Sequence, residues 1–114
     1  MKDHLITFET AVLAKQKGFK LDQLYYYKKK PLTQSLLQKW LREVYGIHIQ
    51  PFYHPNTIST REIKPEVEIV RVFAKDGITK SILPPSLKGK EYNTYEEALE
   101  IGLQAALKLI NLKP

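Results

Sequence analysis

The spacing of the apolar residues changes from helical to extended at Gly46, and this change constrains the fold more than any other feature of the chain. Before it, residues 34–45 carry apolar side chains on one face, with Thr33 suited to begin a helix and Gly46 to end it. We expect Trp40 on the core side of that helix. After Gly46, residues 47–53 alternate with a period of two, which is typical of a half-buried strand. The sequence therefore predicts a domain that combines helices with strands.

A second β signal follows further along the chain. Residues 67–74 are rich in β-branched side chains, and Lys75-Asp76-Gly77 is a turn sequence that leads into a further apolar stretch at 78–83. These features predict two strands joined as a hairpin. Residues 55–65 between the first strand and this hairpin are predicted to be a loop.

The clearest helix start is Thr94-Tyr95-Glu96-Glu97, which has the pattern of a capping box and predicts a helix over 95–110. An apolar stripe runs along this segment and includes Gly102 in mid-helix, where glycine costs roughly 1 kcal/mol relative to alanine. We expect Gly102 to mark a close approach of the helix to the sheet.

The first fifth of the chain predicts another helix, over residues 8–17, with Thr7 as its cap and Gly18 as its end. Phe8, Ala11 and Val12 share a face at helical spacing, and we expect that face in the core. Residues 19–32 contain three consecutive tyrosines, three consecutive lysines and a proline. They are predicted to form an extended or irregular connector.

These elements predict a single α+β domain over residues 1–114, with a small three-stranded antiparallel sheet packed by about three helices in the order α-α-β-β-β-α. A three-stranded sheet exposes two edges, which are open to pairing with another protein or with a second copy of the chain.

The charge is unevenly placed along the sequence. The chain has 18 Lys and Arg against 12 Asp and Glu, a net charge of +6. The segment from Lys15 to Arg42 holds eight of the basic residues and only one acidic residue. Basic side chains interleaved with aromatic ones suit contact with phosphates and stacking on bases. The candidate nucleic-acid-binding residues are Tyr25, Tyr26, Tyr27, Lys28, Lys29, Lys30, Lys39 and Arg42. The alternative is that the lysines are a solvated surface that keeps the protein soluble.

The sequence gives little support for catalysis, cofactor binding or metal binding. The chain has no cysteine, so thiolate catalysis, disulfides and thiolate zinc sites are excluded. The three histidines have no carboxylate at a ligand spacing, and we expect no metal and no cofactor. There is no glycine-rich phosphate loop and no catalytic pair, so we expect the protein not to be an enzyme. The 15 or so residues between the first two predicted helices are too many for the short turn of a helix-turn-helix.

Three stretches carry a resemblance to other proteins: residues 6–11 with 17–19, residues 33–44, and residues 94–100 with 105–110. They are similar to short uncharacterised proteins from phages and prophages of Bacteroides and its relatives. The resemblance implies a small accessory protein in the cytoplasm of a bacterial host, and it carries no known activity. We therefore expect either nucleic-acid association, with DNA or RNA, or an interaction module that uses the sheet edge or the last helix to bind a phage or host protein or to form a homodimer. No membrane-spanning segment is expected.

Overall fold

Threonine caps begin all three helices at the predicted positions. In the computed structural model of this chain, Thr7 accepts a hydrogen bond from the amide of Thr10 at 3.2 Å and Thr33 accepts one from the amide of Leu36 at 3.2 Å. Thr94 accepts one from the amide of Glu97 at 3.0 Å. Each bond satisfies one of the amides that a helix start leaves without a partner.

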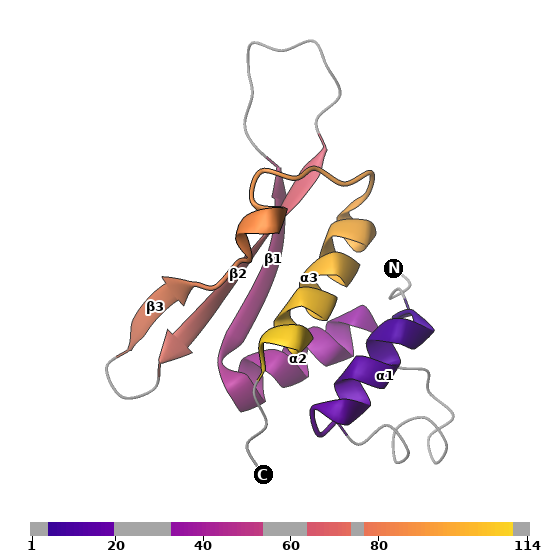
Figure 1. Cartoon of the computed structure of the whole chain (residues 1–114), viewed down its shortest axis with the longest axis vertical. Helices are drawn as coiled ribbons and strands as arrows, with labels where there is room; N and C mark the ends of the chain where they lie inside the picture. Colours follow the sequence, from indigo (N-terminus) through magenta and orange to yellow (C-terminus); the bar gives the residue numbers. More distant parts are fainter. Residues whose placement is uncertain (1–4, 20–32, 54–63, 74–76, 111–114) are drawn as a thin grey trace.

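The structure describes residues 5–19, 33–53, 64–73 and 77–110. In chain order the elements are α1 (Phe8–Gln16), α2 (Gln34–Tyr45), β1 (Ile47–Tyr53), β2 (Pro65–Phe73), β3 (Ile78–Ser81), the short 3-10 turn η2 (Pro85–Leu87) and α3 (Tyr95–Leu109). The predicted α+β class and the order α-α-β-β-β-α are confirmed (Figure 1).

The sheet has the order β1-β2-β3, and both neighbouring pairs are antiparallel. Ile47 lies opposite Arg71, and Ile49 lies opposite Ile69. Since side chains alternate between the two faces of a sheet, the odd-numbered residues of β1 and β2 share one face. Ile47, Ile49 and Ile69 are each at most 2% exposed, so this face carries the core.

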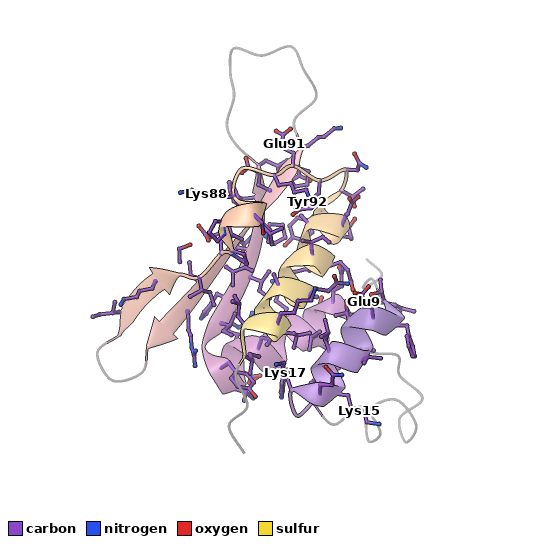
Figure 2. All side chains as sticks on the ribbon, viewed as in Figure 1. Glu9, Lys15, Lys17, Lys88, Glu91 and Tyr92 are labelled. Carbon is purple, nitrogen blue, oxygen red and sulfur yellow. The ribbon has the colours of Figure 1, made fainter. Side chains whose placement is uncertain are left out.

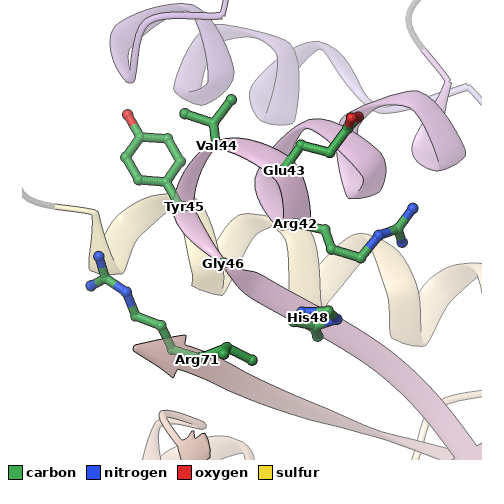
Figure 3. A pocket seen from close by; sticks show the side chains of 8 residues that line it. Arg42, Glu43, Val44, Tyr45, Gly46, His48 and Arg71 are labelled. Atoms are coloured by element: carbon green, nitrogen blue, oxygen red, sulfur yellow. The ribbon is translucent and has the colours of Figure 1, made fainter. Parts of the chain in front are cut away.

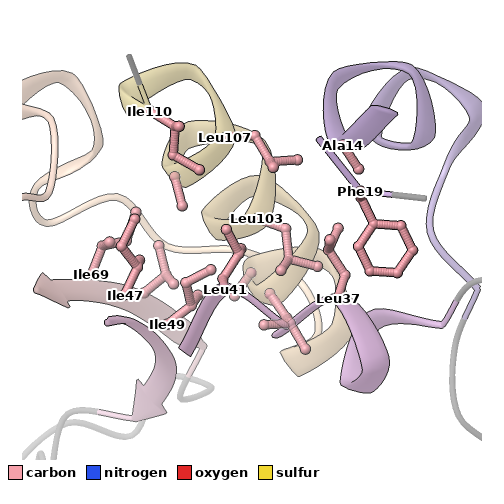
Figure 4. Close-up of a cluster of buried hydrophobic side chains, with 14 of the residues drawn as sticks. Ala14, Phe19, Leu37, Leu41, Ile47, Ile49, Ile69, Leu103, Leu107 and Ile110 are labelled. Carbon is pink, nitrogen blue, oxygen red and sulfur yellow. The ribbon is translucent and has the colours of Figure 1, made fainter. Parts of the chain in front are cut away.

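Helices α2 and α3 cover that face of the sheet (Figures 1 and 4). The packing is closest at Gly102, as the sequence predicted. A Cβ atom at this position would lie 2.6 Å from Cγ2 of Ile49 and 2.8 Å from Cγ2 of Val67. Only a residue without a side chain allows α3 to approach the strands at this distance.

Hydrogen bonds between the helices show that all three helices point their C-terminal ends toward the same end of the molecule. Near the helix starts, the amide of Thr7 donates to Glu100 at 3.0 Å, and Nε2 of Gln34 donates to the carbonyl of Glu96 at 2.8 Å. Near the helix ends, Nζ of Lys17 donates to the carbonyl of Ile110 at 2.6 Å. The hydroxyl of Tyr45 donates to the carbonyl of Lys17 at 3.0 Å. The three helices therefore end toward the bottom of Figure 1, where β1 also begins.

The predicted core face of the first helix is wrong. Phe8 is 84% exposed and Val12 is also exposed, whereas Thr10 and Ala14 are fully buried. Hydrogen bonds, and not apolar packing, explain this orientation of α1. The hydroxyl of Thr10 donates to Oε2 of Glu100 and accepts from Nε2 of Gln104, so hydrogen bonds to α3 turn the threonine face of α1 inward.

Other sequence predictions differ in detail. The second strand begins at Pro65, inside the predicted loop, because its first residues pair with the end of β1. The third strand ends at Ser81, although the amide of Ile82 still bonds the carbonyl of Ile69 at 2.8 Å. Trp40 is half-buried, and its ring contacts the rings of Phe19 and Tyr45 edge to face. The connector over 20–32 and most of the 55–65 loop lie outside the described residues.

Candidate nucleic-acid interface

Two of the predicted site residues lie in the part of the chain that the structure describes. Lys39 and Arg42 are three residues apart on α2, and both are exposed on its solvent side. The other six, Tyr25 to Tyr27 and Lys28 to Lys30, lie outside the described residues. The structure therefore brings two of the eight together on one helix face.

Positive side chains lie together at the end of the molecule where the helices finish. They come from α1, α2, α3, β2 and β3, and from the residue directly after α1. Lys15, Arg42 and Lys108 lie in the last turns of α1, α2 and α3. Arg71 lies opposite the first residue of β1, and it pairs with Lys80 of β3. The set that we name the basic end consists of Lys15, Lys17, Arg42, Arg71, Lys80 and Lys108.

Negative side chains lie mainly in the other half of the fold. Of the eight glutamates in the described residues, only Glu43 belongs to the basic end. The others lie in the first halves of α1, β2 and α3, and in the segment before α3. Figure 2 shows this separation, with Glu9 and Lys15 at opposite ends of α1, and with Glu91 far from the helix ends. In the described residues, positive side chains therefore gather at the end where the helices finish, and negative side chains lie mainly toward the end where the helices begin.

Helix ends account for part of this positive charge. A helix C-terminus carries roughly half a negative charge, so three of them offset about 1.5 positive charges. The basic end holds six cationic side chains and one glutamate, so the helix ends balance only part of its positive charge. Lys17 also has a structural role, because its ammonium group bonds the carbonyl of Ile110 beyond the end of α3.

An open pocket of about 500 Å³ lies at the basic end, where α2 turns into β1. Its lining includes Arg42, His48 and Arg71, with Glu43 beside them. Figure 3 shows the guanidinium groups of Arg42 and Arg71 on opposite sides of the turn at Gly46, with His48 on the strand below. The two arginines are therefore not a clamp around a single small anion. Cations spaced along a surface instead suit a ligand that carries several phosphates.

The described residues offer no comparable arrangement for metal binding or catalysis. They contain no group of three or more His, Asp or Glu side chains that could hold a metal ion. Glu100 is engaged by hydrogen bonds from Thr7, Thr10 and Gln34. Burial raises the pKa of the Tyr92 phenol, and the negative charge of Glu97 raises that pKa further. Tyr92 lies at the end opposite the basic end, as Figure 2 shows.

Of the six members of the basic end, only Arg42 is among the candidate residues predicted from the sequence. Lys15 and Lys17 lie in the predicted basic segment, whereas nothing in the sequence singled out Arg71, Lys80 and Lys108. They lie 29 or more residues beyond Arg42, outside the basic segment of the sequence. Pairing the predicted strands 67–74 and 78–83 across the 75–77 turn would place Arg71 opposite Ser81, so the sequence already brings Arg71 near Lys80. The observed register, with Phe73 opposite Ile78, makes Arg71 and Lys80 direct partners. The position of Lys108 depended on the direction of α3 relative to α2, which only the fold reveals.

The apolar stripe of α3, which the sequence offered as a surface for a partner, forms part of the core. Its residues Ala98, Leu99, Leu103 and Leu107 are each at most 4% exposed. No helix in the described ranges is long and apolar enough to cross a membrane. The chain matches no family model, no curated protein and no solved structure, so the assignment of function depends on the surface described above.

Proposed function

We propose that this protein is a non-enzymatic accessory protein, of the phage or prophage type, that binds nucleic acid through its basic end. The observation that carries the proposal is the separation of charge, with six cationic side chains and one glutamate around the converging helix ends. A surface of one sign attracts a polyanion over distances of about a Debye length, roughly 10 Å at 0.1 M salt. The similarity of the sequence to small phage and prophage proteins is compatible with such a role.

The proposed contacts are to phosphates rather than to bases. Trp40, the aromatic residue nearest to Lys39 on α2, has its ring 5.1 Å from that of Phe19 and 5.3 Å from that of Tyr45. It is therefore engaged inside the fold and offers no free platform for base stacking. The exposed aromatic residues Phe8, Tyr53 and Tyr95 lie at the start of α1, the end of β1 and the start of α3, away from the basic end. We therefore assign base stacking at this interface to Tyr25, Tyr26 and Tyr27. Without them, binding is expected to depend weakly on base sequence.

The test is a fluorescence-anisotropy titration with single- and double-stranded DNA and RNA at about 50 and about 200 mM salt, a range over which phosphate contacts weaken steeply. The first variant is Lys39→Gln combined with Arg42→Gln, which removes from α2 one exposed charge of the basic end, Arg42, and the exposed charge about one helical turn before it, Lys39. Its matched control is Lys88→Gln combined with Lys90→Gln, which removes two exposed charges from the opposite half.

The salt dependence of the affinity distinguishes a direct phosphate contact from a general effect of the protein's net charge. If both side chains bind phosphates of a duplex, the α2 variant should flatten the slope of log K against log salt by about 1.8, since each contact contributes about 0.9. The control should leave the slope near that of the original protein. Equal loss in the two variants would contradict a localised interface. Absence of binding by the original protein at low salt would refute the proposed function.

The connector is tested separately by replacing Lys28, Lys29 and Lys30 with glutamine. If the basic end binds alone, this triple variant should keep a salt-dependent affinity. If binding disappears, the site lies in the connector and not on the described surface.

A further inference from the structure

The two edges of the sheet are protected to different degrees. The carbonyl of Gly46 accepts the amide of Val72 at 2.9 Å, so even-numbered residues of β1 point their backbone groups toward β2. Odd-numbered residues therefore point theirs to the free edge. There the carbonyl of Ile49 is bonded by Nε2 of Gln38 at 2.6 Å, and Pro51 has no amide to offer. The β1 edge is thus poorly suited to pairing with another strand.

The β3 edge has no such protection among the described residues. The amide of Ile82 bonds the carbonyl of Ile69, so even-numbered residues of this segment face β2. The backbone groups of Thr79 and Ser81 consequently point away from the sheet. All four residues of β3 are exposed. An unpaired row of amides and carbonyls is a template for another strand.

The same region of the sheet extends beyond the helices. Past Val72 the strand β1 has no further residues to pair, so the described end of the β2–β3 ribbon, the pair of Phe73 and Ile78, has no third strand beside it. This end lies at the lower left of the sheet in Figure 1. Val72 is 36% exposed on one face of the ribbon, and Ile78 is 48% exposed on the other. A two-stranded hairpin on its own is at best marginally stable in water, so this part gains most from an additional strand.

We propose that the β3 edge pairs with the β3 edge of a second copy of this chain, so that two three-stranded sheets join into one antiparallel sheet of six strands. The sequence of β3 fits itself in the register that places Thr79 opposite Thr79 of the second copy. In that register Ile78 lies opposite Lys80, so the two lysines do not face each other directly. Cross-strand threonine pairs are favourable, and like charges directly opposite each other are not.

The inference goes beyond the proposed function and does not depend on it. The dimer would place the two basic ends side by side, because Lys80 and its neighbour Arg71 lie next to the shared edge. Their repulsion should make self-association stronger at high salt, at least threefold between about 50 and about 500 mM, as screening increases. Nucleic-acid binding has the opposite salt dependence, so the two proposals succeed or fail independently.

The experiment is sedimentation equilibrium of the protein without nucleic acid, from about 10 µM to about 1 mM, since a four-residue strand forms a small and therefore weak interface. The variant Thr79→Pro removes only an outward-facing amide and leaves the bonds between β2 and β3 in place. The control Thr79→Val keeps the amide and the β-branched shape. We expect the original protein and the valine variant to dimerise and the proline variant to remain monomeric.

A cross-linking measurement covers the case in which the proline variant fails to fold. The chain has no cysteine, so Thr79→Cys introduces a single thiol. Opposed residues of an antiparallel pair have Cα atoms about 5.5 Å apart, within disulfide range. The control Ser86→Cys places a thiol on exposed η2. Faster oxidation to a covalent dimer at position 79 than at 86 supports the proposal. Equal rates, a strict monomer throughout, or a dimer that survives Thr79→Pro would overturn it.

Discussion

Glu100 joins the starts of two helices to α3, and its replacement by glutamine should cost the fold more than any other exchange of a glutamate. Its Oε2 accepts from the amide of Thr7 at 3.0 Å, from the hydroxyl of Thr7 at 3.1 Å and from the hydroxyl of Thr10. Its Oε1 accepts from Nε2 of Gln34 at 2.9 Å. The carboxylate thus occupies the place of an anion at the N-terminus of α1.

The size of the effect follows from these four bonds. In Glu100→Gln, the remaining carbonyl oxygen can take the place of Oε2 and keep three donors, but as a neutral acceptor. The amide group then faces the amide of Gln34, donor against donor, and that bond is lost. A hydrogen bond to a charged group contributes about 1.5–3 kcal/mol and a neutral one about 0.5–1.5 kcal/mol. Because the site is half-buried, we expect a loss of about 2 kcal/mol in the free energy of unfolding.

Urea denaturation followed by circular dichroism measures this loss, with Glu97→Gln as the matched control. Glu97 is exposed in the first turn of the same helix, and its exchange should cost less than about 1 kcal/mol. If the two variants lose the same stability, the carboxylate of Glu100 does not hold the helix starts together. A double-mutant cycle with Gln34→Ala should then also show no coupling, whereas we expect a coupling of about 1 kcal/mol.

Three further predictions use the same stability assay. Gly102→Ala should destabilise by about 1–3 kcal/mol despite its better helix propensity, because the added methyl group meets Ile49 and Val67; a stabilised variant would contradict the close contact. Tyr92→Phe should keep or raise stability by up to about 1 kcal/mol, since its buried hydroxyl has no described partner. As the folded pKa of Tyr92 is raised, stability should fall as pH rises above about 10, and the phenylalanine variant should fall less steeply. Phe8→Ser should change stability by no more than about 0.5 kcal/mol, and a loss of several kcal/mol would place Phe8 in the core after all.

The helix over 34–45 and the strand after it could be predicted to the residue because several local signals agree there. Thr33 caps the helix, and Gly46 takes the left-handed conformation with φ of 67°. A Cβ atom on Gly46 would also lie 2.8 Å from the carbonyl oxygen of Val72, so the same glycine fits the sheet as well as the helix end. Local and tertiary requirements coincide at this position, which is why the sequence alone was sufficient.

The orientation of α1 could not be predicted from apolar spacing, because the contacts that orient it lie 90 or more residues away. Thr10 is drawn inward by Glu100 and Gln104, two polar residues of α3. Apolar periodicity assumes that the buried face is the apolar one. Here a set of hydrogen bonds decides the orientation, and Phe8 is left in solvent.

The basic end illustrates how charge along a sequence becomes charge on a surface. Acidic residues favour helix starts and basic residues favour helix ends, so three helices that point the same way separate charge without any selection for a ligand. Lys15, Arg42 and Lys108 fit that explanation. It does not apply directly to Arg71 and Lys80, which lie on strands and not in the last turn of a helix. Replacing Arg71 and Lys80 with glutamine is therefore the sharper test. If the nucleic-acid affinity does not change, stabilisation of the helix ends is enough to explain the basic end.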